Sequence, residues 1–381
     1  MSEHVDQTVC EPASLEQVRT VAEQHAASAE QNRRIAPEVV KALLAQGFAR
    51  YFVPQALGGL SGPFAGLVSW LRTVGTGCTS AAWCGAICAV TGRMAAYLPT
   101  QSQQTIWGDG PDVAISASFR STGKVVPSKD GWLLSGEWHF LSGIDFASWA
   151  LLCIEPTGDE QAARYAAVPA SSYRIIDNWQ TLGMRGTGSK SIVLDQIFVP
   201  AQMTFLKRDL WSGQSAYAQG PRYQVSPIGA DPHLFMACAL GAATAALKSW
   251  SHAFQGEPPV GELAGIYARS AAELDAAQLL IERGCQTIDL GALPAALVAR
   301  NARDASLAAD LVLTAINRLF RLGGSHTHFS HNALQQRWRD VQTLTSHVGL
   351  RPEFNFAQYT RTVWSTRQAD STGQARTLQS A

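Results

Sequence analysis

Apolar residues recur at helical spacing through the first hundred residues of the chain. Between Leu15 and Ala45 the spacing predicts two helices, with Pro37 at a first helical position and Gly47 at a C-terminal stop. Two more helices are expected in this part, at Pro63–Val74 and from about Thr79 to Leu98. The N-terminal part is therefore predicted to be mainly helical.

The pattern changes between Pro111 and Pro200. Short segments rich in β-branched and aromatic residues are separated here by Gly, Ser, Asp and Pro, as in VAISASF, WLLSGEWHFLSG, SWALLCI and SIVLDQIFVP. Such segments are typical of strands joined by turns. This part of the chain is therefore predicted to be an antiparallel β domain.

Helical spacing returns after Asp231. The expected helices are Leu234–Phe254, Leu263–Ile288, Pro294–Leu322 and Asn332–Val348. The stretch after Trp364, which contains Ser, Thr, Gln and Gly, predicts a frayed tail. The order of elements predicts an α+β, mainly α protein with domains at residues 1–110, 111–205 and 206–381.

Charge and composition narrow the function. Lys plus Arg and Asp plus Glu both number 30 in the 381 residues, so no basic surface is expected for nucleic acid or anionic lipid. The first residues lack the pattern of a signal peptide and no apolar stretch reaches membrane-spanning length, which favours the cytoplasm. The seven cysteines form no CxxC pair and are expected to be buried thiols. Many small residues and few charges favour an oligomer.

Familiar nucleotide and metal motifs do not fit. The segment GMRGTGSKS has Ser189 before Lys190, whereas a P-loop needs glycine there, and a strand rather than a helix follows. For the same reason it is not a Rossmann turn, so the chain is not expected to take hydride from a nicotinamide by itself. His326, His328 and His331 lack a nearby carboxylate or thiol, and we expect a polar loop rather than a metal site.

Three segments resemble the acyl-CoA dehydrogenase superfamily. They are Gly131–Leu152, Asn178–Pro200 and Arg321–Leu350, the last with an Arg339-Asp340 pair and Ser346-His347. They are most similar to the two-component flavin-dependent monooxygenases of group D, such as the actinorhodin-type aromatic polyketide hydroxylases and the oxygenase components of phenol hydroxylases. The resemblance implies an N-terminal helical domain, a middle antiparallel β-barrel and a C-terminal four-helix bundle. It also implies a homotetramer, with flavin between domains and subunits.

The resemblance implies an oxygenase component. Such an enzyme takes FMNH2 or FADH2 from a separate NAD(P)H:flavin reductase and uses O2, through a C4a-hydroperoxyflavin, to hydroxylate an aromatic or polycyclic small molecule, here in secondary metabolism. Dehydrogenases of the superfamily have a glutamate after the Arg-Asp pair, but this chain has Thr345-Ser346-His347. Glu273 or Glu282 could still provide a base, so a dehydrogenase remains an alternative. An amino-sugar N-oxygenase and a binding module without catalysis are the others.

Two catalytic residues follow from the resemblance. Ser142, in the run Phe140-Leu141-Ser142-Gly143, matches the serine that lies against flavin N5 and helps to hold its proton. Leu141 stands where some relatives have the first serine of an SSG turn, which leaves the register open by one residue. His347 matches a histidine at the flavin edge that binds the distal oxygen of the hydroperoxide or a substrate hydroxyl. The alternatives are a simple turn residue and a structural histidine at a helix end.

The remaining candidates concern binding. Phe140, Leu141, Met184, Arg185, Gly186, Thr187 and Ser189 are expected to contact the flavin. Gly324 and Ser325 are expected to bind a flavin phosphate from a neighbouring subunit. Trp83 and Arg93 are expected to line the substrate cavity. The alternative for the flavin-contacting segment is a tight turn, and for Gly324 and Ser325 it is a helix cap. For Trp83 the alternative is core packing. No metal is expected.

Overall fold

The N-terminal part folds as helices, as the sequence predicts. The computed structural model describes residues 12–156, 162–252, 254 and 256–379. The helices are α1 (Pro12–Gln24), α2 (Ala26–Asn32), α3 (Pro37–Gln46), α4 (Phe64–Gly77), α5 (Thr79–Ala95) and α6 (Thr100–Trp107). Helix α3 begins at Pro37 and ends at Gly47, whose φ of 97° is left-handed, so both expected limits are confirmed. The stretch predicted as two helices is three, because the chain bends at His25 between α1 and α2.

The middle part contains the strands β1 (Ile115–Ser118), β2 (Lys124–Ser128), β3 (Gly131–Leu141), β4 (Trp149–Ile154), β5 (Arg164–Pro169), β6 (Arg174–Ile176), β7 (Lys190–Pro200) and β8 (Thr204–Leu206). They form two four-stranded sheets, in the orders β1-β4-β5-β8 and β2-β3-β7-β6. The expected all-antiparallel barrel therefore needs a correction. Strands β1 and β4 pair in parallel, because the chain leaves their sheet to form β2 and β3 and returns in the same direction.

The two sheets meet at Trp138. This side chain on β3 is fully buried, and its indole nitrogen donates to the carbonyl oxygen of Cys153 on β4 at 3.0 Å. Ser118 on β1 also donates to the carbonyl oxygen of His139 on β3. A large ring with one satisfied polar atom suits such an interior. The end of β3 is therefore held firmly against the other sheet.

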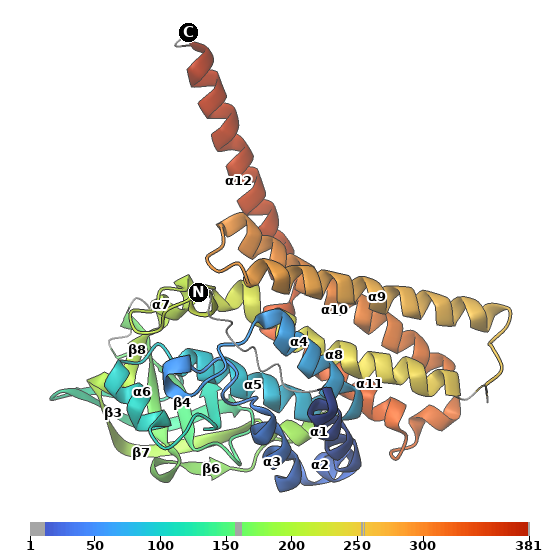
Figure 1. The fold of residues 1–381 in the computed structure, drawn as a ribbon, viewed down its shortest axis with the longest axis horizontal. Helices are drawn as coiled ribbons and strands as arrows, with labels where there is room; N and C mark the ends of the chain where they lie inside the picture. Colours follow the sequence, from blue (N-terminus) through green and yellow to red (C-terminus); the bar gives the residue numbers. More distant parts are fainter. Residues whose placement is uncertain (1–11, 157–161, 253, 255, 380–381) are drawn as a thin grey trace, which may run out of the picture.

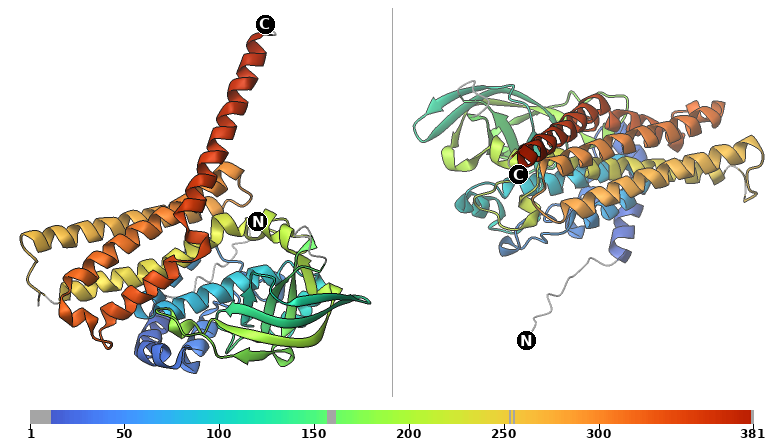
Figure 2. Two further views of the ribbon diagram at one scale, coloured as in Figure 1. Left: turned by 180° about the vertical axis from the view of Figure 1, so that it is seen from behind. Right: turned by 90° about the horizontal axis from the view of Figure 1, so that it is seen from above.

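The C-terminal part consists of α7 (Lys207–Ser212), α8 (Pro227–His252), α9 (Glu262–Ile288), α10 (Ala295–Leu322), α11 (Ala333–Thr345) and α12 (Pro352–Gln379). Helices α8 to α11 lie side by side as a bundle (Figure 1). Helix α8 is long and apolar enough to cross a membrane, but 72% of its most apolar stretch is buried inside the structure, as in a core helix. The stretch after Trp364 continues α12, which projects from the body in Figure 1 and in the left view of Figure 2, so the expected frayed tail was wrong. It contains no proline, and helical backbone bonds need no tertiary partner.

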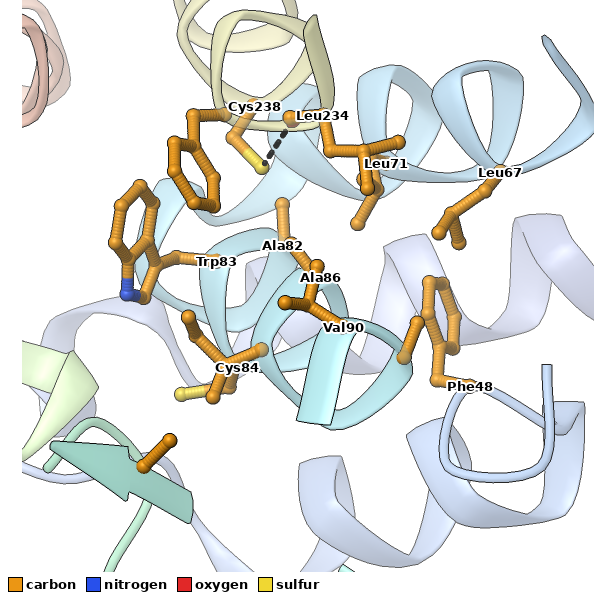
Figure 3. Close-up of a cluster of buried hydrophobic side chains, with 14 of the residues drawn as sticks. Phe48, Leu67, Leu71, Ala82, Trp83, Cys84, Ala86, Val90, Leu234 and Cys238 are labelled. Carbon is orange, nitrogen blue, oxygen red and sulfur yellow. Dashed lines mark hydrogen bonds between the residues drawn. The ribbon is translucent and has the colours of Figure 1, made fainter. Parts of the chain in front are cut away.

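Two glycines bring the N-terminal helices close to the bundle. A Cβ on Gly241 of α8 would lie 2.3 Å from the carbonyl oxygen of Arg72, and one on Gly75 of α4 would lie 2.8 Å from that of Cys238. Helices α4 and α8 thus approach almost backbone to backbone. Helix α5 packs beneath them, in the apolar cluster of Figure 3. This packing places one face of α5 against α8 and another against β1.

Candidate active site

The end of β3 exposes an aromatic ring. Phe140 has a left-handed φ of 63°, which is uncommon for a bulky residue, and its side chain is 67% exposed. The strand register shifts between Trp138 and Leu141, so this irregularity redirects the chain at Phe140. The ring of Trp179 meets the Phe140 ring edge to face, with centroids 6.2 Å apart. A strained backbone that exposes a large ring is expected at a binding site rather than in a plain turn.

Three buried hydroxyl groups form a hydrogen-bonded series that begins at Ser142, whose N–H donates to the Phe140 carbonyl oxygen at 3.1 Å. The Ser142 and Ser189 oxygens are 2.7 Å apart, and the Ser189 and Thr187 oxygens are also 2.7 Å apart. Thr187 donates to the carbonyl oxygen of Met184 at 2.8 Å. The indole nitrogen of Trp83 on α5 donates to the Ser142 oxygen at 3.0 Å. Figure 3 shows this nitrogen turned away from the aliphatic side chains of the apolar cluster.

His347 also contacts Trp83. Its ring centroid is 5.8 Å from that of Trp83 and 4.8 Å from that of Phe235 on α8. The Gly349 backbone N–H donates to His347 Nδ1 at 3.1 Å, so in the neutral ring Nε2 carries the proton and can donate. Burial lowers the pKa of His347 to about 4, so the ring is neutral at neutral pH. Four elements therefore converge at Trp83: α5, the end of β3, α8 and the residues after α11.

The turn after β6 joins the middle domain to α11. Met184 has a left-handed φ of 56°, and its N–H donates to the buried Asp340 carboxylate at 2.6 Å. Arg339 donates to the Leu182 carbonyl oxygen at 2.7 Å and to the Glu30 carboxylate at 2.6 Å. The Arg-Asp pair thus fixes this turn to the helix that leads to His347.

Gly183 has no room for a side chain at this contact. A Cβ would lie 2.1 Å from the Arg339 carbonyl oxygen, which is backbone of α11 and cannot move independently. Gly183→Ala is therefore expected to destabilise the fold by roughly 1–3 kcal/mol in urea unfolding. Gly265→Ala is the control, since a Cβ there meets no atom within 4 Å and alanine favours the helix. Equal stability of Gly183→Ala and the wild type would contradict this contact.

Asp340 gives the fold a pH dependence. Burial raises the pKa of Asp340 from 3.8 to about 7, with Glu30 adding to the shift. Because the pKa of Asp340 is higher in the folded protein than in the unfolded one, the contribution of this carboxyl to the free energy of unfolding is fully present below pH 3.8. This contribution is lost as the pH rises to about 7. Asp340→Asn keeps an acceptor for Met184 without the charge. The melting temperature of Asp340→Asn minus that of the wild type is therefore expected to increase as the pH rises from 3.8 to about 7. A constant difference across this range would exclude the effect.

The structure brings together most of the predicted residues. Ser142, His347, Trp83, Phe140, Met184, Arg185, Gly186, Thr187 and Ser189 lie in the features described above or directly beside them. Leu141 does not fit its expected role, since its side chain is fully buried in the core. In the run Phe140-Leu141-Ser142, Phe140 therefore carries the exposed ring and Ser142 carries the hydroxyl that joins the buried hydroxyl groups.

Arg93 and the Gly324-Ser325 pair lie elsewhere. Arg93 is fully buried, where it donates to the Val225 carbonyl oxygen at 3.0 Å and the Asp231 carboxylate at 2.9 Å, so its guanidinium is engaged by the protein. Gly324 and Ser325 lie at the far end of α11 from His347, separated by a 13-residue helix of about 20 Å. Their expected contact with a flavin of another subunit stays a prediction.

Two aromatic residues of the site were not predicted. Phe235 packs on both Trp83, at 4.6 Å between centroids, and His347. Trp179 contacts Phe140 and donates to the Met184 carbonyl oxygen at 3.0 Å. Phe235 stands in an apolar helix, where nothing in the sequence separates it from core residues. Trp179 belongs to a matched segment, and its position next to the turn was the available signal.

The residues fit a flavin. A flat isoalloxazine needs apolar surface for its face and polar partners at its edge. The exposed Phe140 ring offers such a surface, and Ser142 and His347 offer an oxygen and an N–H nearby. No group of three or more His, Cys, Asp or Glu side chains suited to a metal ion occurs within the described residues.

Comparison with known proteins identifies the family. Residues 263–352 match the family model for the acyl-CoA dehydrogenase C-terminal domain. The chain is 30% identical over 351 residues to the flavin-dependent monooxygenase oxygenase subunit HsaA of Mycobacterium tuberculosis, covering 86% of this chain and 88% of that protein. It is 27% identical to the FADH(2)-dependent resorcinol hydroxylase oxygenase component of a Rhizobium species, covering 84% and 86%. The crystal structure of 3-HSA hydroxylase from a Rhodococcus species superposes with a TM-score of 0.87 at 26% identity, covering 93% and 96%.

The fold is that of the acyl-CoA dehydrogenases, as the sequence predicts. Within it, the chain belongs to the oxygenase components of the two-component flavin-dependent monooxygenases. These enzymes use reduced flavin, delivered by a separate reductase, and O2 to hydroxylate aromatic substrates. The expected activity, cofactors and reductase partner are thereby confirmed at the level of the family.

Proposed function

We propose that Ser142 and His347 are the catalytic residues of this oxygenase, and that Trp83 lies between them at the substrate cavity. The observation that carries the proposal is that the Ser142 hydroxyl and the His347 imidazole both contact the indole ring of Trp83. A bound reduced flavin would supply the two electrons that activate O2, so that one oxygen atom is transferred to an electron-rich aromatic carbon and the other leaves as water. The chain itself must position the reactants and exclude water.

The roles of the two residues follow from their protonation. His347 is neutral and presents an Nε2–H, so it donates a hydrogen bond to oxygen or to a phenolic hydroxyl without placing a charge in the site. Ser142 would hold the flavin edge near N5. Trp83 and Phe235 surround the imidazole with apolar surface that suits an aromatic substrate.

Glu273 and Glu282, the two bases considered for a dehydrogenase, are engaged by other side chains. Both oxygens of Glu273 are held by Arg318, at 2.7 and 2.8 Å. Glu282 accepts from Gln278 at 2.7 Å on the same helix, α9. Neither glutamate contacts Trp83 or His347, so the described residues favour oxygen transfer over proton abstraction from an acyl-CoA.

The names of the relatives support an aromatic substrate. They include a resorcinol hydroxylase, a p-hydroxyphenylacetate 3-hydroxylase and an indole-3-acetate monooxygenase. We take FADH2 as the first cofactor to test, because the resorcinol enzyme is named for it. Carbon hydroxylation is thus favoured over oxygenation of an amino sugar. A polycyclic substrate and a place in secondary metabolism remain predictions.

A homotetramer in the cytoplasm, with domains at residues 1–110, 111–205 and 206–381, completes the proposal. Large apolar side chains on α9 and α12 support subunit contacts: Leu279 is 67% exposed, and Phe354 and Trp364 are each 59% exposed. Surfaces of this kind are usually covered in an assembly. Light scattering of the purified chain tests the oligomeric state.

Activity is tested with isotopically heavy O2. The purified chain is mixed with an NADH:flavin reductase, NADH, FAD or FMN, and a panel of phenols and polycyclic aromatics. We expect a hydroxylated product whose new oxygen comes from O2 and not from water. A chain that gives no such product with either flavin, but whose bound flavin is bleached by an acyl-CoA without O2, would be a dehydrogenase.

A further inference from the structure

We propose that Thr187, Ser189 and Trp83 are positioning residues that fix the direction of the Ser142 hydroxyl, so that the site discriminates between the redox states of flavin. The inference rests on the proposed function, in which Ser142 contacts the flavin edge. It concerns where each hydroxyl proton points along the buried hydrogen-bonded chain.

The direction of hydrogen-bond donation along the three hydroxyl groups is set at Thr187, the group farthest from the proposed flavin. The Met184 carbonyl oxygen can only accept, so Thr187 must use its single hydroxyl proton in the 2.8 Å bond to that oxygen. Trp179 donates to the same carbonyl at 3.0 Å, which keeps it facing the turn. Thr187 can therefore only accept from Ser189, 2.7 Å away. Ser189 in turn can only accept from Ser142, also at 2.7 Å.

Trp83 completes the arrangement at Ser142. An indole nitrogen is a donor only, and it occupies one lone pair of the Ser142 oxygen at 3.0 Å. The Ser142 proton is directed to Ser189, so one lone pair of the oxygen remains for a bound group. Ser142, Ser189 and Thr187 are all buried, so water does not readily scramble these directions. Ser142 is thus prepared to accept a hydrogen bond and not to donate one.

This polarity matches one redox state of flavin. Reduced flavin carries a hydrogen on N5 and can donate to Ser142. Oxidised flavin has a lone pair on N5, which would face the lone pair of the Ser142 oxygen. To bind oxidised flavin equally well, the hydrogen bonds between Ser142, Ser189 and Thr187 would all have to reverse direction. Thr187 would then have to give up its bond to the Met184 carbonyl oxygen. The arrangement therefore favours the reduced cofactor and aids release of the oxidised one.

The test compares affinities rather than turnover. Dissociation constants for oxidised and reduced FAD are measured by fluorescence quenching, the latter under anaerobic conditions. Thr187→Val keeps the shape of the side chain but removes the fixed acceptor of Ser189, so Ser142 becomes free to donate. The ratio of the oxidised to the reduced constant is expected to fall about tenfold, roughly the worth of one hydrogen bond. Thr187→Ser should restore it.

Thr91→Val is the matched control. Thr91 is buried on α5, and its hydroxyl oxygen lies 2.7 Å from the carbonyl oxygen of Ile87 and 2.8 Å from that of Ile115, either of which can accept its single proton. Neither acceptor belongs to the Ser142–Ser189–Thr187 hydroxyl groups, so the loss of the Thr91 hydroxyl should leave the ratio unchanged. Ser189→Ala interrupts the chain independently and replaces Thr187→Val if the latter does not fold. An unchanged ratio in the folded variants overturns the proposal. A wild-type chain that binds neither form of flavin contradicts the proposed function instead.

Discussion

His347→Ala is expected to lower the rate of hydroxylated product formation by about 10²- to 10⁴-fold, while reduced flavin still binds. The imidazole is held by the Gly349 N–H and by the rings of Trp83 and Phe235, so its removal takes away the placed N–H donor and opens space for water. Reduced flavin should still be consumed, with H2O2 formed in place of product. Product, H2O2 and flavin affinity are measured side by side.

The control for this change is His331→Ala. His331 is exposed in the loop before α11, and its loss should leave product and H2O2 unchanged. Since burial lowers the pKa of His347 to about 4, its titration should not appear in the rate between pH 6 and 8. If His347→Ala forms product at the wild-type rate, the histidine is only a structural residue at the end of α11.

Arg93→Met is expected to destabilise the fold by roughly 3–5 kcal/mol, because it leaves a buried carboxylate without its partner. Arg93 is fully buried, and its bond to Asp231 is 2.9 Å long. The pKa of Asp231 is already raised, chiefly by burial, and Arg93 opposes that shift. Urea unfolding followed by circular dichroism measures the loss.

Two further variants test the reason for this loss. In Arg93→Met with Asp231→Leu no charge is left buried, so much of the stability should return. Arg208→Met is the surface control. Its ion pair with Asp209 is 3.7 Å long and exposed, so its loss should cost less than about 1 kcal/mol. If the double variant is no more stable than Arg93→Met, the loss comes from packing and not from the charge of Asp231.

The sequence was sufficient where a local rule or a motif decides the outcome. Pro37 and Gly47 delimit α3 because each residue has a restricted or unusual backbone preference. Ser142 and His347 are 205 positions apart, and only the resemblance to a family placed both at one flavin. The structure then shows the contacts that join them through Trp83.

Other features depend on tertiary contacts that leave no local pattern. Trp83 and Phe235 stand in apolar helices, where an aromatic residue of the site resembles an aromatic residue of the core. We expected Arg93 to line a substrate cavity. The sequence does not reveal that the Asp231 carboxylate lies against its guanidinium. The parallel pairing of β1 and β4 depends on the path of the chain between sheets, which alternating residues cannot encode.

Met184 supplies both of its peptide groups to the site. Its N–H is bound by Asp340 of the helix that leads to His347, and its carbonyl oxygen receives the proton of Thr187, at the end of the chain that reaches Ser142. The two proposed catalytic groups thus share one anchor in the backbone, held at a left-handed φ of 56°. The position of the Ser142 hydroxyl is therefore tied through this one turn to the position of α11, at whose end His347 lies.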